Sequence, residues 1–325
     1  MKIKKEYIVL AVIIVALSLY LIFQNRDRNS YQLPKIAKVA GDDVTKIEII
    51  KGNQQPIRIS KAGSEWEILP KKYPADAARI KAMLDVISGL KLTALVSESK
   101  NYPLYDLDDT NRIHVKAWIK DKVALEFDTG KAASSFRHTF VKLPGDPMVY
   151  HARDNFRRKF DLSINELRDK KVLAFDKDTI HEIRIQKGEE ELLISRRAPE
   201  EEKEADKESG TETDPEKAKK PAWVTEKNEA IDDAALQRLL STLADLKCEN
   251  YMEGDNAGAT LANPILHIVL QGEKAYELSL FDKIETESAS YPAISSENPY
   301  AFLLPSWRVE ALLKAPDEML KKQGK

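Results

Sequence analysis

The side chains best suited to chemistry lie in the acidic stretch Asp106-Leu107-Asp108-Asp109. Neighbouring carboxylates of this kind could act as the acid and base of a hydrolase, or could bind a glycan through hydrogen bonds. The stretch also resembles the start of a calcium-binding loop, but it lacks the required glycine, and Ala117 stands where the last acidic ligand would be. We therefore expect no calcium site, and keep the carboxylates as candidates for a hydrolase or a glycan-binding site.

The remaining histidines and serines form no recognised catalytic or metal-binding motif. His181-Glu182 lacks the second histidine of a zinc-protease helix. Ser134-Ser135 and His138 could be drawn as a nucleophile and a base, but closeness within one polar turn is weak support for that chemistry. The sequence therefore predicts no catalytic residue, no metal ligand and no cofactor.

Two other features have both a functional and a structural interpretation. His114 and His267 stand at matching places in two apolar strands, where they could be paired pH-sensitive or ligand-binding sites. The pattern favours outward-facing strand positions between core residues. Cys248 is the only cysteine, which excludes an intramolecular disulfide and a cysteine-rich metal site. It aligns with Leu92, so we expect a core position rather than a catalytic thiol.

The composition excludes some classes of partner. The chain has 325 residues, 51 of them basic and 53 acidic, for a formal net charge of −2. A nucleic-acid-binding protein normally has a clear basic excess, so we expect no nucleic-acid partner. The length indicates two domains, and the hydrophobic fraction of 42% is enough for packed cores.

The N-terminus carries a long apolar run, from Tyr7 to Phe23, in which Ser18 is the main polar interruption. As a helix, the run would extend roughly 26 Å, close to the ~30 Å hydrocarbon core of a bilayer. A cleaved signal peptide is the main alternative, but no small-residue cleavage site follows the run. We expect a transmembrane anchor over residues 1–29. Basic residues before it favour a single-pass protein of the inner (cytoplasmic) membrane, with its N-terminus inside and the bulk of the chain extracytoplasmic, in the periplasm.

Beyond a polar stalk at residues 30–42, the chain repeats itself, as 43–171 and 172–325. Val44–Gly52 and Ile180–Gly188 show the same strand alternation and end in a glycine. A tryptophan-centred strand follows in each copy, and then an amphipathic helix that begins at Asp76 or Asp232. The apolar positions of the helices align as Ile80, Leu84, Ile87 and Leu90 with Leu236, Leu240, Leu243 and Leu246. The predicted fold class is α+β, an N-terminal transmembrane helix followed by two homologous α+β repeats with mostly antiparallel sheets.

The second copy differs from the first by an insertion at residues 198–221. This stretch is rich in charged residues and has no large apolar side chain, so it is expected to be a disordered loop. Solvation is the favoured role, and electrostatic docking is the alternative.

The chain resembles the domain of unknown function family 4340 over about residues 40–315. The resemblance rests on the anchor, the twin repeats, the strands around Trp66 and Trp223, Tyr105-Asp106-Leu107-Asp108, and the link Leu167–Phe175 that begins Leu-Arg-Asp-Lys. Family members typically read Gly-Leu-Asp-Pro in each repeat. Here Asp106 replaces the glycine and Asp109 the proline, whereas the second copy reads Gly258–Pro264 with the acid lost.

The resemblance implies a membrane-anchored envelope protein that is often found beside ABC transport components similar to those of gliding motility. It supplies no catalytic residues. We therefore expect a non-enzymatic accessory or scaffold protein that contacts the inner membrane through Tyr7 to Phe23 and a membrane partner such as an ABC permease. The alternative is an envelope glycan-binding module or hydrolase that uses carboxylates, such as Asp106, Asp108 or Asp109, in a cleft between the repeats.

Overall fold

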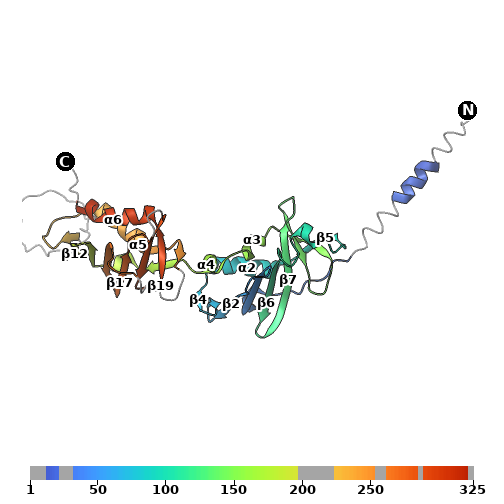
Figure 1. Cartoon of the computed structure of the whole chain (residues 1–325), viewed down its shortest axis with the longest axis horizontal. Helices are drawn as coiled ribbons and strands as arrows, with labels where there is room; N and C mark the ends of the chain where they lie inside the picture. Colours follow the sequence, from blue (N-terminus) through green and yellow to red (C-terminus); the bar gives the residue numbers. More distant parts are fainter. Residues whose placement is uncertain (1–11, 22–31, 197–222, 253–260, 285–287, 321–325) are drawn as a thin grey trace, which may run out of the picture. The chain divides into compact units, whose positions relative to one another are not determined.

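A computed structural model describes residues 12–21, 32–196, 223–252, 261–284 and 288–320 (Figure 1). The chain divides into two compact units, Met1–Asp169 and Lys170–Lys325, which are described separately. The charged insertion expected at residues 198–221 lies outside the described residues.

The first unit is built on a nine-stranded antiparallel sheet in the order β4-β3-β2-β1-β6-β7-β8-β9-β5. Its strands are β1 (Lys46–Lys51), β2 (Ile57–Ala62), β3 (Glu65–Leu69), β4 (Tyr73–Pro74), β5 (Leu92–Ser97), β6 (Ile113–Ile119), β7 (Lys122–Ala132), β8 (His138–Lys142) and β9 (Val149–Arg153). Its helices are η1 (Gly41–Asp43), α2 (Ala77–Gly89), η2 (Tyr102–Tyr105), α3 (Arg157–Phe160) and α4 (Ile164–Leu167).

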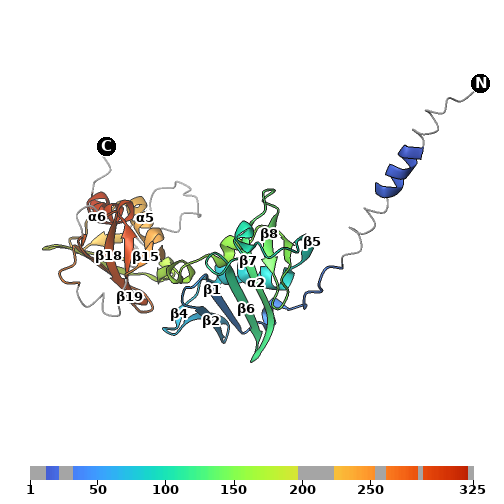
Figure 2. The same ribbon diagram turned by 45° about the vertical axis from the view of Figure 1, so that its right-hand side comes forward.

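Alternation of apolar and polar side chains, clearest in β1, β6 and β8, gives this sheet one core face and one solvent face. In β1, Ile47 and Ile49 are buried, whereas Glu48 between them is partly exposed. The core face packs against α2, which lies beside the sheet in Figure 2 and buries Ile80, Met83 and Ile87. On the other face, charged residues pair with one another across the strands.

The second unit contains an eight-stranded antiparallel sheet in the order β13-β12-β11-β16-β17-β18-β19-β15 and a separate pair, β10-β14. Its strands are β10 (Lys171–Ala174), β11 (Glu182–Lys187), β12 (Glu190–Arg196), β13 (Trp223–Thr225), β14 (Asp245–Lys247), β15 (Asn250–Tyr251), β16 (Leu266–Gln271), β17 (Ala275–Leu280), β18 (Ser290–Ser295) and β19 (Asn298–Pro305). Its helices are η3 (Lys177–Thr179), α5 (Asp233–Leu243) and α6 (Ser306–Leu320).

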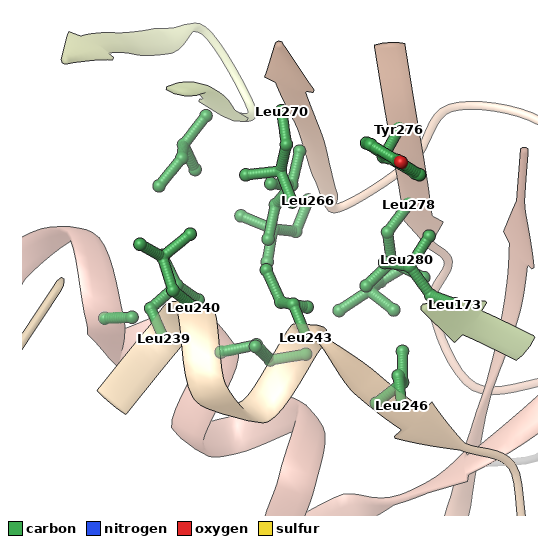
Figure 3. Close-up of a cluster of buried hydrophobic side chains, with 14 of the residues drawn as sticks. Leu173, Leu239, Leu240, Leu243, Leu246, Leu266, Leu270, Tyr276, Leu278 and Leu280 are labelled. Carbon is green, nitrogen blue, oxygen red and sulfur yellow. The ribbon is translucent and has the colours of Figure 1, made fainter. Parts of the chain in front are cut away.

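The core of the second unit is a leucine-rich layer between helix and sheet. Figure 3 shows Leu239, Leu240 and Leu243 of α5 facing leucines of β16 and β17. Cys248 is buried in the same core, as its alignment with Leu92 led us to expect.

Corresponding strands follow one another in the same order across the two large sheets. β3-β2-β1-β6-β7-β8-β9-β5 in the first unit corresponds to β13-β12-β11-β16-β17-β18-β19-β15 in the second. The register agrees too, because Ile47 is paired with Ile59 and Ala117, and Ile183 with Ile194 and Leu270.

The predicted fold class, α+β units behind an N-terminal transmembrane helix, is wrong. The described residues form mainly antiparallel β-sheet. In the described part of the chain, no helix is long and apolar enough to cross a membrane. Residues 12–21 are helical, and at ~1.5 Å per residue such a segment covers about half of a ~30 Å hydrocarbon core. The rest of the predicted anchor lies outside the described residues.

Candidate functional site

The acidic stretch singled out from the sequence is a hydrogen-bonded turn. The carboxylate of Asp108 accepts hydrogen bonds from the backbone N–H groups of Thr110 (3.1 Å) and Asn111 (3.2 Å) and from Asn111 Nδ2. The side-chain hydrogen bond from Asn111 is the main reason that the pKa of Asp108 lies below its usual value. Asp109 lies 2.9 Å from Arg112 in an exposed ion pair. These two carboxylates therefore shape the turn and its surface.

The first residue of the stretch has an unusual backbone conformation. Asp106 has φ 55° and ψ 38°, in the left-handed region that favours glycine. The next residue, Leu107, is buried, so the turn at Asp106 directs a leucine into the unit. Gly130 of β7 lies beneath, where a Cβ atom would stand 2.0 Å from the carbonyl oxygen of Tyr105. The motif thus packs a turn tightly onto the sheet.

A charged cluster on the solvent face of the first sheet is centred on Asp128. His114 Nδ1 lies 2.6 Å from Asp128 Oδ1, and Lys142 Nζ lies 3.1 Å from Oδ2. Arg112 approaches the same oxygen at 3.6 Å. The side chain of Asp128 is only 8% exposed, so its charge is balanced mainly by these neighbours.

The balance of forces on Asp128 favours the ionised carboxylate. Burial alone would raise its pKa, but the hydrogen bonds from His114 and Lys142 and the positive charge of Lys142 outweigh burial, and the pKa lies below its usual value. A carboxylate only accepts hydrogen bonds, so His114 Nδ1 donates in this pair.

The cluster continues along the strands as rows of alternating charge. Glu126 Oε1 lies 3.2 Å from His114 Nε2 and 3.3 Å from Lys116 Nζ. In the next strands, Glu48 Oε2 accepts a hydrogen bond from Arg58 Nε at 2.7 Å. Cross-strand neighbours of opposite charge stabilise the sheet. This arrangement accounts for His114 as a residue of a paired polar surface.

The matching histidine of the second unit has a different partner. His267 Nδ1 lies 2.9 Å from Ser279 Oγ, and Ser279 faces it in the strand register as Asp128 faces His114. The place of the Asp128 carboxylate in the first unit is thus taken by the Ser279 hydroxyl in the second. The two histidines therefore do not form equivalent pH-sensitive sites.

A second pair of imidazoles lies near the edge of the first sheet. The rings of His138 and His151 stack with centroids 5.1 Å apart, and Phe140 lies 5.0 Å from His151. Partial burial and the charge of His138 lower the pKa of His151. The structure gives no contact of His138 with Ser134 or Ser135. Ser135 Oγ instead accepts a hydrogen bond from the backbone N–H of Arg137.

The first unit also has an open groove between η1, β3 and the outer side of α2. Its volume is about 440 Å³. Trp66 forms one wall, Ile80 and Leu84 contribute apolar surface, and the polar rim includes Asp42, Ser64, Lys81, Asp85 and Ser88. The sequence matched Trp66 with Trp223 as structural equivalents, and gave no reason to expect a groove at one of them.

Among the residues that the structure describes, the most exposed large apolar side chain of each unit lies on a corresponding loop. Phe136, in the loop between β7 and β8, is 74% exposed, and Ile284, after β17, is 68% exposed. Phe136 has φ 55°, and its backbone N–H donates to the carbonyl of Ala133 at 2.8 Å, so a defined turn presents the ring. The signal available in the sequence was an aromatic residue within a polar turn.

Within the described residues, histidine, cysteine, aspartate and glutamate side chains do not gather in threes in a way that could hold a metal ion. The fold defines a protein of two antiparallel β units with paired charges on the face of the first sheet. Residues 68–264 match the family described as Domain of unknown function (DUF4340), and the chain belongs to that family. No curated protein and no solved structure matches the chain.

Proposed function

We propose that this chain is a non-enzymatic accessory protein of the cell envelope that docks onto a membrane partner of an ABC-type transport system. The observation that carries the proposal is the pair of exposed apolar side chains, Phe136 and Ile284, on corresponding loops. Large side chains that fill a pocket of the partner supply most of the binding energy in many protein–protein interfaces, and aromatic residues are frequent among them. A protein with such a residue on each unit is suited to hold a partner at two points.

The charged residues around these anchors also support a docking role. Arg137 follows Phe136, and Lys283 precedes Ile284, where its Nζ lies 5.0 Å from the ring centroid of Tyr291. A cation beside an apolar anchor contributes to specificity and to the rate of association.

The proposal places the chain outside the cytoplasm, in contact with the inner membrane through Tyr7 to Phe23. Its support is the exposure of the apolar side chains in the described part of that stretch, among them Val12, Ile14 and Leu21. Apolar surface of this extent is expected to associate with lipid or with another protein. The proposal concerns contact with the membrane and does not include a spanning helix.

A hydrolytic or glycan-binding role receives less support from the candidate carboxylates. Asp108 is held by the hydrogen bonds of its own turn, and Asp109 pairs with Arg112. Asp106 ends η2 in a left-handed backbone conformation, so its place in the structure is explained by the turn itself.

Site-specific photocrosslinking in cells tests the proposal. A photoreactive phenylalanine analogue at position 136 is expected to give a reproducible crosslink to a membrane transport component. Lys122, at the opposite end of β7, is the matched control because it is also exposed. A crosslink pattern at 136 that is the same as at 122, or that contains no membrane protein, contradicts the proposal.

A further inference from the structure

We infer that the groove beside Trp66 binds a lysine or arginine side chain of a partner protein. The inference goes beyond the proposed function, because it concerns the chemistry of a different surface and needs no transport partner. It rests on a comparison of the groove with the same place in the second unit.

The two places correspond residue by residue. The backbone N–H of Lys61 donates to the carbonyl of Thr45, and that of Arg196 donates to the carbonyl of His181, both at 2.9 Å. Lys61 faces Trp66 in the strand register as Arg196 faces Trp223. The comparison therefore matches η1 with η3, and α2 with α5.

In the second unit, side chains of the chain itself fill this place. Lys177 of η3 reaches across to α5, where its Nζ lies 3.4 Å from Ser241 Oγ. The guanidinium of Arg196 lies 5.3 Å from the ring centroid of Trp223. Trp223 itself is only 6% exposed.

In the first unit, Lys61 corresponds to Arg196, and its Nζ donates to the carbonyl oxygen of Asp42 at 3.2 Å as Arg196 donates to that of Asp178 at 3.0 Å. The part of the place that Lys177 fills in the second unit is open. Gly41 stands where the second unit has Lys177, so no side chain crosses from η1 to the helix. Asp85 stands where the second unit has Ser241, which adds a negative charge to the wall. Trp66 is half-buried, and no cation lies over its ring among the described residues.

The groove is therefore shaped for a cation from elsewhere. A lysine or arginine stem can lie along Trp66 and Leu84, while its charged group reaches Asp85 or Asp42. Asp85 already pairs with Lys81 at 3.1 Å, but the side chains are 58% and 75% exposed, and such surface pairs are weak. An incoming cation can thus replace Lys81 at little cost.

The test uses the full chain labelled with ¹⁵N-tryptophan, whose four indole signals are assigned by single substitutions. The probe is the peptide acetyl-Ala-Ala-Lys-Ala-Ala-amide, compared with the same peptide carrying uncharged norleucine in place of lysine. We expect the Trp66 signal to shift saturably with the lysine peptide. We expect the norleucine peptide to bind about tenfold more weakly. No shift of Trp66, or equal affinities, overturns the inference.

Gly41 provides the matched variants. A Cβ atom at this position would lie 3.6 Å from Leu84 Cβ and 3.7 Å from its carbonyl oxygen, which are ordinary contacts. Gly41→Lys should therefore fill the groove as Lys177 fills its counterpart, and weaken peptide binding by about tenfold. Gly41→Ala should bind like the wild type. Asp85→Asn is a second variant on the exposed helix surface that should also weaken binding. Wild-type affinity in Gly41→Lys or in Asp85→Asn contradicts the inference.

Discussion

Asp76 and Asp232 hold the same place in the two units. The carboxylate of Asp76 accepts a hydrogen bond from the backbone N–H of Arg79 (2.9 Å), and that of Asp232 accepts one from Ala235 (3.0 Å). Each backbone N–H also donates to the end of its own unit, Asp76 to Leu167 at 2.8 Å and Asp232 to Met319 at 3.0 Å. One residue per unit thus begins the main helix and ties it to the last one.

Loss of either cap should destabilise only its own unit. Asp76→Ala and Asp232→Ala should each lower the free energy of unfolding by about 1 kcal/mol, because an N-terminal backbone N–H loses its acceptor. Hydrogen exchange should show faster exchange in α2 for the first variant and in α5 for the second. Asn at either position is the matched control and should stay close to wild type, since asparagine caps helices equally well. Equal effects on both units in either variant would contradict this account.

Asp106 is expected to be a site where glycine improves stability. Its φ of 55° is costly for a residue with a Cβ atom and free for glycine. Asp106→Gly should raise the free energy of unfolding of the first unit by about 0.5 kcal/mol, and Asp106→Ala should lower it by a similar amount. Urea unfolding measures both. A destabilised glycine variant would show that the Asp106 side chain makes a contribution larger than its backbone strain.

Asp128 should make the stability of the first unit depend on pH in the acidic range. Its pKa is lowered in the fold, so the ionised form stabilises the unit. That stabilisation is complete above the pKa of an unfolded aspartate, about 3.9, and is lost as pH falls through the lower folded value. Asp128→Asn should lower the free energy of unfolding by about 2 kcal/mol at neutral pH. It should also weaken the dependence of that free energy on pH in the acidic range. The control is Asp109→Asn, whose exposed pair with Arg112 should contribute little. If the free energy of unfolding depends on acidic pH in the same way in wild type and in Asp128→Asn, this role of Asp128 is refuted.

The stacking of His138 on His151 predicts that the first side chain influences the pKa of the second. The pKa of His151 is lowered first by partial burial and second by the charge of His138. Its neutral form therefore stabilises the fold, fully above about pH 6.5, and this contribution is lost as pH falls through the lower folded pKa. In His138→Phe, an NMR titration should show that the pKa of His151 rises but stays below its ordinary value, because burial persists. His181→Gln in the second unit should leave it unchanged. An unchanged pKa of His151 in His138→Phe would contradict this prediction.

Local patterns in the sequence located several elements well. The expected strand around Trp66 is β3, and the expected helix starts at Asp76 and Asp232 are the caps of α2 and α5. Alternation and capping depend on neighbouring residues, so the sequence contains what decides them.

The limits of the elements and the binding surfaces depend on distant contacts. The apolar pattern predicts that the second helix continues to Leu246, but α5 ends at Leu243, and Leu246 pairs with Leu173 in the strand pair β10-β14. Hydropathy predicts a spanning helix at the N-terminus, but no helix of the described residues is long and apolar enough to cross a membrane. The groove beside Trp66 depends on which side chain crosses from η1, a contact that aligned tryptophans do not reveal.

The docking proposal is tested most directly by quantitative co-purification from crosslinked membranes. Wild type, Phe136→Ser, Ile284→Ser and the double variant should be compared at equal expression, with Lys122→Ser as the control. We predict that the same membrane transport component is recovered with wild type and the control, less with each single variant, and least with the double variant. Equal recovery of that component with wild type and the double variant, or recovery of no membrane protein at all, would contradict the proposal.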